Sequence, residues 1–184
     1  PKAYREELFK ENSNLGTLYK NIMRFEESEI YYLKALAHAD TLCLINQQAY
    51  AVYLGSTLLN IGNLYTRMKR YEDAMRYLKK SLPILHSLYE NTPKAFILNY
   101  FSINLSLGNV SICLNKQKDG EKYFLTAADL GEKLYAASPQ SFGMEYYKIL
   151  KNLGIIYIYL DDIDNAEKYN LKAYELISRL YQEN

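Results

Sequence analysis

The segment NIGNLYTRMKRYEDAMRYLKKSL, residues 60–82, contains the pattern that decides the fold of this chain. Its apolar residues recur at intervals of three and four on either side of a short break, which is typical of two α-helices that each bury one face. Gly62 stands in the middle of the first helical stretch, where glycine costs about 1 kcal/mol relative to alanine. A glycine at such a position indicates that a neighbouring helix comes close to the backbone there.

This glycine recurs at a fixed interval along the whole chain. Each occurrence follows Leu or Ile and lies 46 residues after the one before it, at Gly16, Gly62, Gly108 and Gly154. The 184 residues therefore divide into four units: 1–46, 47–92, 93–138 and 139–184. A repeat of this kind indicates one structural unit used several times. Because the last unit ends where a fifth would begin, we expect these residues to be part of a longer array.

Each unit is predicted to form two antiparallel helices of about 18–22 residues, which makes the chain all-α. In the third unit, helical spacing runs from Pro93, breaks at NKQKDG (115–120) and resumes from about Asp119. Pro139 ends the unit, because proline disfavours helix at the residue before it. Pro83 falls inside the second helix of its unit, and we expect it to kink or interrupt that helix.

Small residues recur at fixed distances after each glycine and fall on the second helix of each unit. They are Ser28, Ala74, Gly120 and Ala166 twelve residues after the glycine, and Ala35, Ser81, Ala127 and Ala173 nineteen residues after it. Large residues lie between the glycine and the first of these small residues, such as Tyr19, Tyr65 and Tyr157 three residues after the glycine. Alternation of small and large side chains predicts one close helix–helix seam, repeated four times.

This pattern resembles the tetratricopeptide repeat, in which Leu-Gly is followed by Tyr, a second aromatic residue and two alanines at these distances. The resemblance covers the whole chain and is weakest in the third unit, where Ser111 and Gln117 replace both aromatic residues. The usual repeat has about 34 residues, so the chain is most similar to long-helix members such as the kinesin light chain type and arrays in bacterial signalling proteins. The resemblance implies a right-handed α-solenoid whose first helices line a concave groove that binds a peptide or protein.

The resemblance also implies which side chains face a ligand in that groove. They are Asn14, Thr17, Asn60, Asn63, Arg67, Asn109, Lys148, Lys151, Asn152 and Tyr159. Among them is a ladder of amides two residues before the glycines, and an amide can both donate to and accept from an extended peptide backbone. Alternatively, these amides tie neighbouring first helices together.

Composition argues against several other classes of protein. The 22 basic and 21 acidic residues nearly cancel, so neither nucleic acid nor a membrane surface is an expected partner. No apolar run approaches the roughly 20 residues that span a bilayer, and no signal peptide opens the chain. Cys43 and Cys113 have no metal-binding spacing and are interpreted as apolar fillers in a reducing, cytoplasmic compartment.

No catalytic set, metal site or cofactor motif is visible, so we expect no enzyme activity. Three hypotheses remain. The favoured one is a scaffold that binds a protein segment in the groove. The second is a regulatory or sensor segment of a larger bacterial signalling protein, in which the array senses a ligand or docks on an effector domain. The third is an array that self-associates end to end, because neither end shows a capping helix.

Overall fold

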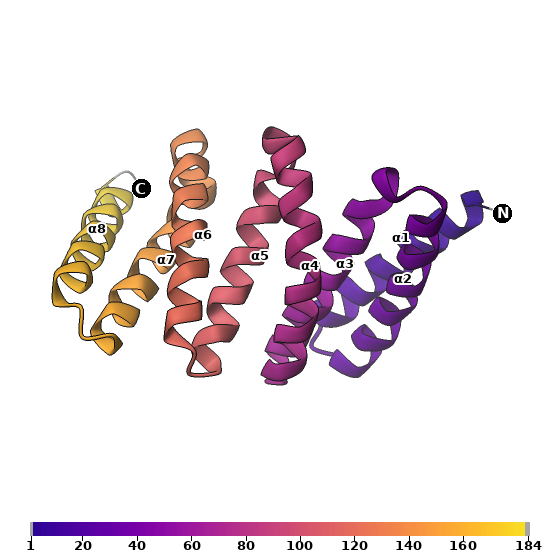
Figure 1. Cartoon of the computed structure of the whole chain (residues 1–184), viewed down its shortest axis with the longest axis horizontal. Helices are drawn as coiled ribbons and strands as arrows, with labels where there is room; N and C mark the ends of the chain where they lie inside the picture. The colour runs from indigo at the N-terminus through magenta and orange to yellow at the C-terminus, as the bar shows by residue number, and fades with distance from the viewer. Residues whose placement is uncertain (1, 183–184) are drawn as a thin grey trace. The chain divides into compact units, whose positions relative to one another are not determined.

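The chain folds into eight α-helices and no strand within residues 2–182, the part that this computed structural model describes (Figure 1). The helices are α1 (Lys2–Asn21), α2 (Phe25–Ile45), α3 (Gln47–Arg67), α4 (Tyr71–Asn91), α5 (Pro93–Cys113), α6 (Gln117–Ala137), α7 (Pro139–Tyr159) and α8 (Ile163–Gln182). The predicted all-α fold of consecutive helix pairs is confirmed. Pro1 and residues 183–184, where the first unit was predicted to begin and the last to end, lie outside the described residues.

Each predicted unit holds one helix pair, and two details differ from expectation. Helix α6 begins at Gln117, two residues before the predicted start. Helix α4 continues without interruption through Pro83, so of the two expected effects, a kink or an interruption, the interruption is wrong. Pro83 lies on the exposed side of α4, as does Lys79, whose carbonyl loses its helical donor. Water can satisfy that carbonyl, which explains why the helix tolerates the proline.

The turn inside each pair has the same backbone conformation in all four units. One residue at its centre is left-handed without being glycine, at Met23 (φ 62°), Lys69 (φ 59°), Asn115 (φ 55°) and Asp161 (φ 60°). The next residue donates its N–H to the carbonyl five residues earlier, as Arg70 does to Tyr65 at 2.8 Å. This hydrogen bond is the Schellman closure of a helix, and it satisfies a carbonyl that the helix end would leave free.

The two helices of a pair touch at the repeated glycine. Ser28 Oγ on α2 donates to the carbonyl of Gly16 on α1 at 2.7 Å, which requires the two backbones to come close. At Gly108, a Cβ atom would lie 2.9 Å from the ring of Phe124, and that ring is fully buried. The four glycines are themselves buried. The repeat therefore places glycine where a Cβ atom would come within 3 Å of a side chain of the second helix.

Contacts between Cα atoms group the chain into two compact units, Pro1–Ser106 and Leu107–Asn184, with the boundary inside α5. In the first unit, α1 packs on α2, α2 on α3 and α3 on α4. One of its clusters joins Phe9 of α1 to Leu42 of α2 and Tyr50 of α3. In the second unit, α6 packs on α7 and α7 on α8, and the cluster there includes Tyr146, Leu176 and Leu180. We refer to these as the N-terminal and C-terminal units and describe each by itself.

Helix α5 corrects one expectation from composition. Among the described residues it is the one helix whose length and composition would allow it to cross a membrane, whereas no run of that kind was expected. Part of its apolar surface is used within the protein, because 39% of its most apolar window is buried. A core helix passes the same test, so length and composition do not by themselves assign α5 to a membrane.

We expect Gly108→Ala to lower the free energy of unfolding by about 1–3 kcal/mol, because the added methyl group overpacks against an immobile ring. Gly154→Ala is the matched control: the atoms nearest to its Cβ would be the amide end of Asn170, an exposed side chain that can turn away. We expect that control to change stability by less than about 1 kcal/mol. Urea unfolding followed by far-UV circular dichroism measures both. Equal losses in the two variants would contradict this account of the glycines.

Candidate functional site

All the residues predicted to face a ligand lie on the first helices of the pairs, and they divide between the two units. The N-terminal unit holds Asn14 and Thr17 on α1 and Asn60, Asn63 and Arg67 on α3; the C-terminal unit holds Asn109 on α5 and Lys148, Lys151, Asn152 and Tyr159 on α7. None of them is fully buried. Each unit therefore presents its own set of accessible first-helix side chains.

In the N-terminal unit, three asparagine amides form what we call the amide face: Asn14, Asn60 and Asn63. Asn14 is exposed, and the other two are half-buried on α3. Asn60 and Asn63 are three residues apart and share one side of that helix. Within residues 2–182, none of the three side chains makes a hydrogen bond, so no bond from them ties α1 to α3. Their donors and acceptors remain open to another molecule.

Thr17 and Arg67 differ from the amides because contacts inside the fold already engage both side chains. Thr17 Oγ1 donates to the carbonyl of Ser13 at 3.0 Å and lies 2.9 Å from the Tyr32 hydroxyl. Arg67 donates to the carbonyl of Lys20 at 3.2 Å, and its guanidinium lies 5.3 Å from the ring centre of Phe25. Thr17 thus joins the two helices of the first repeat, and Arg67 joins the second repeat to the first.

In the C-terminal unit, one side of α7 carries a row that we call the lysine strip: Lys148, Lys151, Asn152, Ile155 and Tyr159. Residues three and four apart share a helix face, so this row is continuous. Lys148 pairs with Glu145 at 3.7 Å, whereas the ammonium of Lys151 has no acidic partner among the described residues. Tyr159 is 72% exposed. The strip thus changes from basic to apolar along the helix.

A polar network that the sequence did not predict joins the first two repeats. Tyr65 on α3 donates its hydroxyl to Glu29 on α2 at 2.6 Å. Arg70 lies 3.2 Å from the same carboxylate, pairs with Asp73 at 2.7 Å, and stacks 4.2 Å from the Tyr65 ring centre. Burial and the bond to Glu29 raise the pKa of Tyr65 well above its usual value. The network fixes the first repeat against the second.

The same link occurs in the C-terminal unit, where Tyr157 on α7 bonds to Glu121 on α6. Burial and this carboxylate likewise raise the pKa of Tyr157. In repeat register, both links join the Tyr three residues after one glycine to the Glu thirteen residues after the previous glycine. Between the second and third repeats these positions hold Met75 and Ser111, which lack both groups. This pairing of positions is the sequence signal that could have found the network.

A cleft beside Pro83 is a second feature that sequence analysis missed. Two adjoining hollows of about 500 and 440 Å³ lie between the end of α2, the start of α3 and α4, and both are lined by Gln47, Ala51 and Ile84. The C-terminal unit has a hollow of about 180 Å³ at the matching register, lined by charged residues and Tyr135. Short residues, such as Cys43 in place of tyrosine, leave the N-terminal cleft open and apolar.

The cysteines and histidines form no chemical centre. Cys43 and Cys113 are free thiols, and burial raises the pKa of Cys43, which keeps it protonated and unreactive. His38 is half-buried, and burial together with Arg5 lowers its pKa. Among the described residues, no group of three His, Cys, Asp or Glu side chains could hold a metal ion.

Sequence models of the tetratricopeptide repeat match residues 12–37, 54–90 and 147–182, which together make up more than half of the chain. The chain belongs to the tetratricopeptide repeat family. Repeats of this family generally serve as protein–protein interaction modules without enzyme activity. No curated protein matches the sequence.

Comparison with solved structures supports the fold. The crystal structure of BtubC (BKLC) from P. vanneervenii aligns with a TM-score of 0.79 and 16% identity, over 96% of this chain and 66% of that chain. The chain thus spans just under two thirds of the length of BtubC. PilF of Pseudomonas aeruginosa aligns with a TM-score of 0.34 and 19% identity, over 98% of this chain and 95% of that one. At this identity, the likeness to BtubC is one of fold, and it agrees with the predicted tetratricopeptide-type repeats.

The raised pKa values of Tyr65 and Tyr157 lead to a pH dependence of stability. Tyrosine in an unfolded chain titrates near pH 10, so above that pH the unfolded chain loses protons that both folded hydroxyls retain. We expect the free energy of unfolding to be unaffected by these groups below about pH 10 and to fall above it, by up to about 1.4 kcal/mol per pH unit for each tyrosine. Urea unfolding at a series of alkaline pH values measures this fall.

The double variant Tyr65→Phe, Tyr157→Phe should show a shallower fall, because it lacks both hydroxyls. Tyr4→Phe, Tyr181→Phe is the matched control, since both of its rings are exposed. If the control flattened the alkaline fall as much as the test variant, the Tyr–Glu links would not be its cause.

Proposed function

We propose that this protein is a binding scaffold that holds an extended segment of another protein along its first helices. The amide face carries the proposal: three asparagine side chains on two successive first helices make no hydrogen bond to any residue in the range 2–182. Every residue of an extended peptide, except proline, offers one backbone donor and one acceptor, and an amide can satisfy both. Binding of this kind depends little on the sequence of the ligand.

In the C-terminal unit, the lysine strip would bind a segment of its own and select it by its chemistry. The unpaired ammonium of Lys151 suits a carboxylate, and the exposed Ile155 and Tyr159 suit an apolar or aromatic side chain further along the ligand. An exposed ion pair contributes only about 0–1 kcal/mol, so the apolar contacts and the amide hydrogen bonds must provide most of the affinity. The preferred ligand is therefore a segment with an acidic residue near an apolar one.

A displayed library of random peptides, selected against residues 1–184, tests the proposal on ligands of any sequence. We expect it to yield extended peptides that bind the parent chain. The double variant Asn60→Ala, Asn63→Ala should bind them about 10–30-fold more weakly, because two hydrogen bonds of about 1 kcal/mol each are lost. Asn91→Ala, on a second helix, is the control and should bind like the parent. Equal binding by all three proteins, with unchanged helicity, would refute the groove hypothesis.

We also expect Lys151→Ala to weaken the acidic peptides from that library several-fold at low ionic strength. The difference from the parent should shrink as salt is added, because salt screens exposed charges. Fluorescence anisotropy of labelled peptides at two salt concentrations measures this, with Lys118→Ala on α6 as the control. A salt-independent loss would show that Lys151 acts through packing and not through its charge.

A further inference from the structure

Two junctions show how one repeat of this protein binds the next. At α2/α3 and at α6/α7, the second helix of one repeat meets the first helix of the following repeat inside a single unit. Both junctions contain the Tyr–Glu hydrogen bond described above. Both also bury an aliphatic residue next to that tyrosine, Leu64 in one and Ile156 in the other, to 0% exposure. A junction thus combines one polar link with apolar contact around it.

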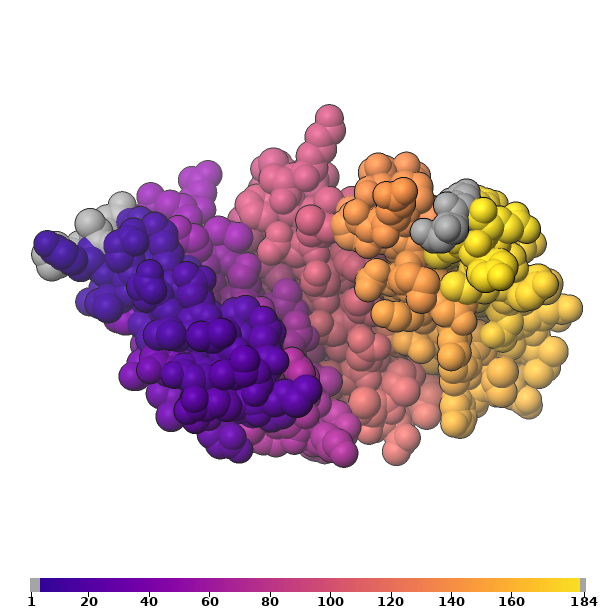
Figure 2. All heavy atoms as spheres, turned by 180° about the vertical axis from the view of Figure 1, so that it is seen from behind, coloured from indigo at the N-terminus to yellow at the C-terminus, as the bar shows by residue number. Residues whose placement is uncertain are grey.

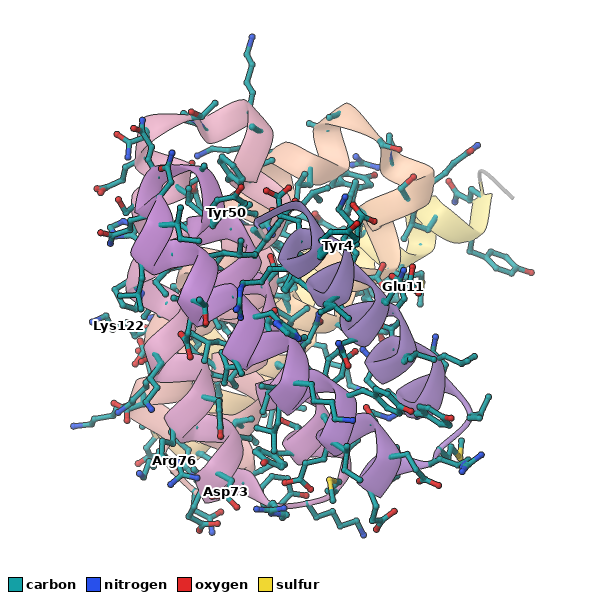
Figure 3. The ribbon with its side chains drawn as sticks, turned by 90° about the vertical axis from the view of Figure 1, so that its right-hand side faces the viewer. Tyr4, Glu11, Tyr50, Asp73, Arg76 and Lys122 are labelled. Atoms are coloured by element: carbon teal, nitrogen blue, oxygen red, sulfur yellow. The ribbon has the colours of Figure 1, made fainter. Side chains whose placement is uncertain are left out.

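Helix α1 presents the same positions without a partner, and we call them the leading face: Tyr4, Leu8, Leu18 and Tyr19. Leu18 corresponds in register to Leu64 and Ile156, yet it is 52% exposed. Tyr4 corresponds to the buried Tyr50 and is 70% exposed; Figure 3 shows it on α1 at the front of the view. The hydroxyl of Tyr19, the counterpart of Tyr65, makes no hydrogen bond to any described residue.

Helix α8 presents the complementary positions, which we call the trailing face: Glu167, Tyr174 and Tyr181. Glu167 corresponds to Glu29 and Glu121, which accept the tyrosine hydroxyls in the two junctions. Tyr174 and Tyr181 correspond to Ala128 and Tyr135, which pack against α7. On α8 they are 68% and 85% exposed. In Figure 2, α8 in yellow and α1 in indigo each lie at an edge of their own unit.

We propose that the trailing face of one copy of this chain binds the leading face of a second copy. Tyr19 of one molecule donates its hydroxyl to Glu167 of the other, as Tyr65 donates to Glu29 within the chain. Leu18 and Tyr4 then pack against Tyr174 and Tyr181 and leave water. Like the two junctions inside the chain, these two faces combine apolar residues with one complementary polar pair.

The chemistry requires a head-to-tail arrangement. Two leading faces would bring tyrosines together without a carboxylate, and two trailing faces would bring two carboxylates together. The contact is therefore heterologous: every molecule that joins leaves one face of each kind free for the next. Association should then continue past the dimer as concentration rises.

Sedimentation velocity of residues 1–184, from low micromolar to several hundred micromolar, tests this proposal with two blocked variants. Leu18→Asp removes the leading face, and Tyr174→Asp removes the trailing face; both side chains are more than half exposed, so the fold should persist. We expect the parent to form concentration-dependent oligomers larger than dimers. Each blocked variant alone should be monomeric, and an equimolar mixture of the two should form a heterodimer and nothing larger.

Leu44→Asp, on an exposed residue outside both faces, is the control and should associate like the parent. Glu167→Gln and Tyr19→Phe should each weaken association about 5–10-fold through the lost hydrogen bond. A parent that stays monomeric at every concentration would overturn the proposal. So would a blocked variant that dimerises alone, because that contact would be symmetric. This inference goes beyond the peptide-binding proposal. A chain that stays monomeric and still binds peptides would disprove the self-association and leave the peptide-binding proposal intact.

Discussion

The two helices of each repeat cross so closely that all four units place glycine, which has no Cβ atom, at the crossing point. The hydrogen bond from Ser28 Oγ to the Gly16 carbonyl and the ring of Phe124 against Gly108 are two expressions of that constraint. Once the pair is held at this distance, the second helix buries small residues and the turn closes in one conformation. One residue of that turn is left-handed in all four units, a conformation that costs about 1–2 kcal/mol. It persists because the packing of the flanking helices determines the conformation of the turn.

Contacts between repeats follow a different logic from contacts within a pair. Within a pair, close packing of side chains holds the two helices together. Between repeats, the Tyr65–Glu29 and Tyr157–Glu121 hydrogen bonds are directional and involve a charged carboxylate, so they are strong and fix the register. The substitution of Met75 and Ser111 at the same positions means that not every junction carries this link. An array whose junctions differ in this way has unequal coupling along its length, and its opening need not begin at the ends.

The helices, their pairing and the family were predictable because each depends on a periodic pattern that recurs four times in the sequence. Which candidate side chains are free was not predictable. Thr17 and Asn63 have the same register, yet Thr17 is engaged by a neighbouring tyrosine and Asn63 is not. The Tyr–Glu links were missed because their partners lie in different repeats and recur only twice. The left-handed conformation of Met23 was also not predictable, because the flanking helices impose it and methionine itself does not favour it.

The Tyr65–Glu29 link and the Asn63 amide lie on different sides of α3. Tyr65, which joins repeats, is two residues after Asn63, and at about 100° per residue their side chains point in nearly opposite directions. A ligand on Asn63 would therefore leave the hydrogen bond from Tyr65 to Glu29 untouched. Addition of a repeat, or of a second molecule through the same type of junction, would lengthen the row of amides without rearranging those already present. A repeat built in this way separates assembly from recognition, so that the extent of the binding surface is set by the number of units joined.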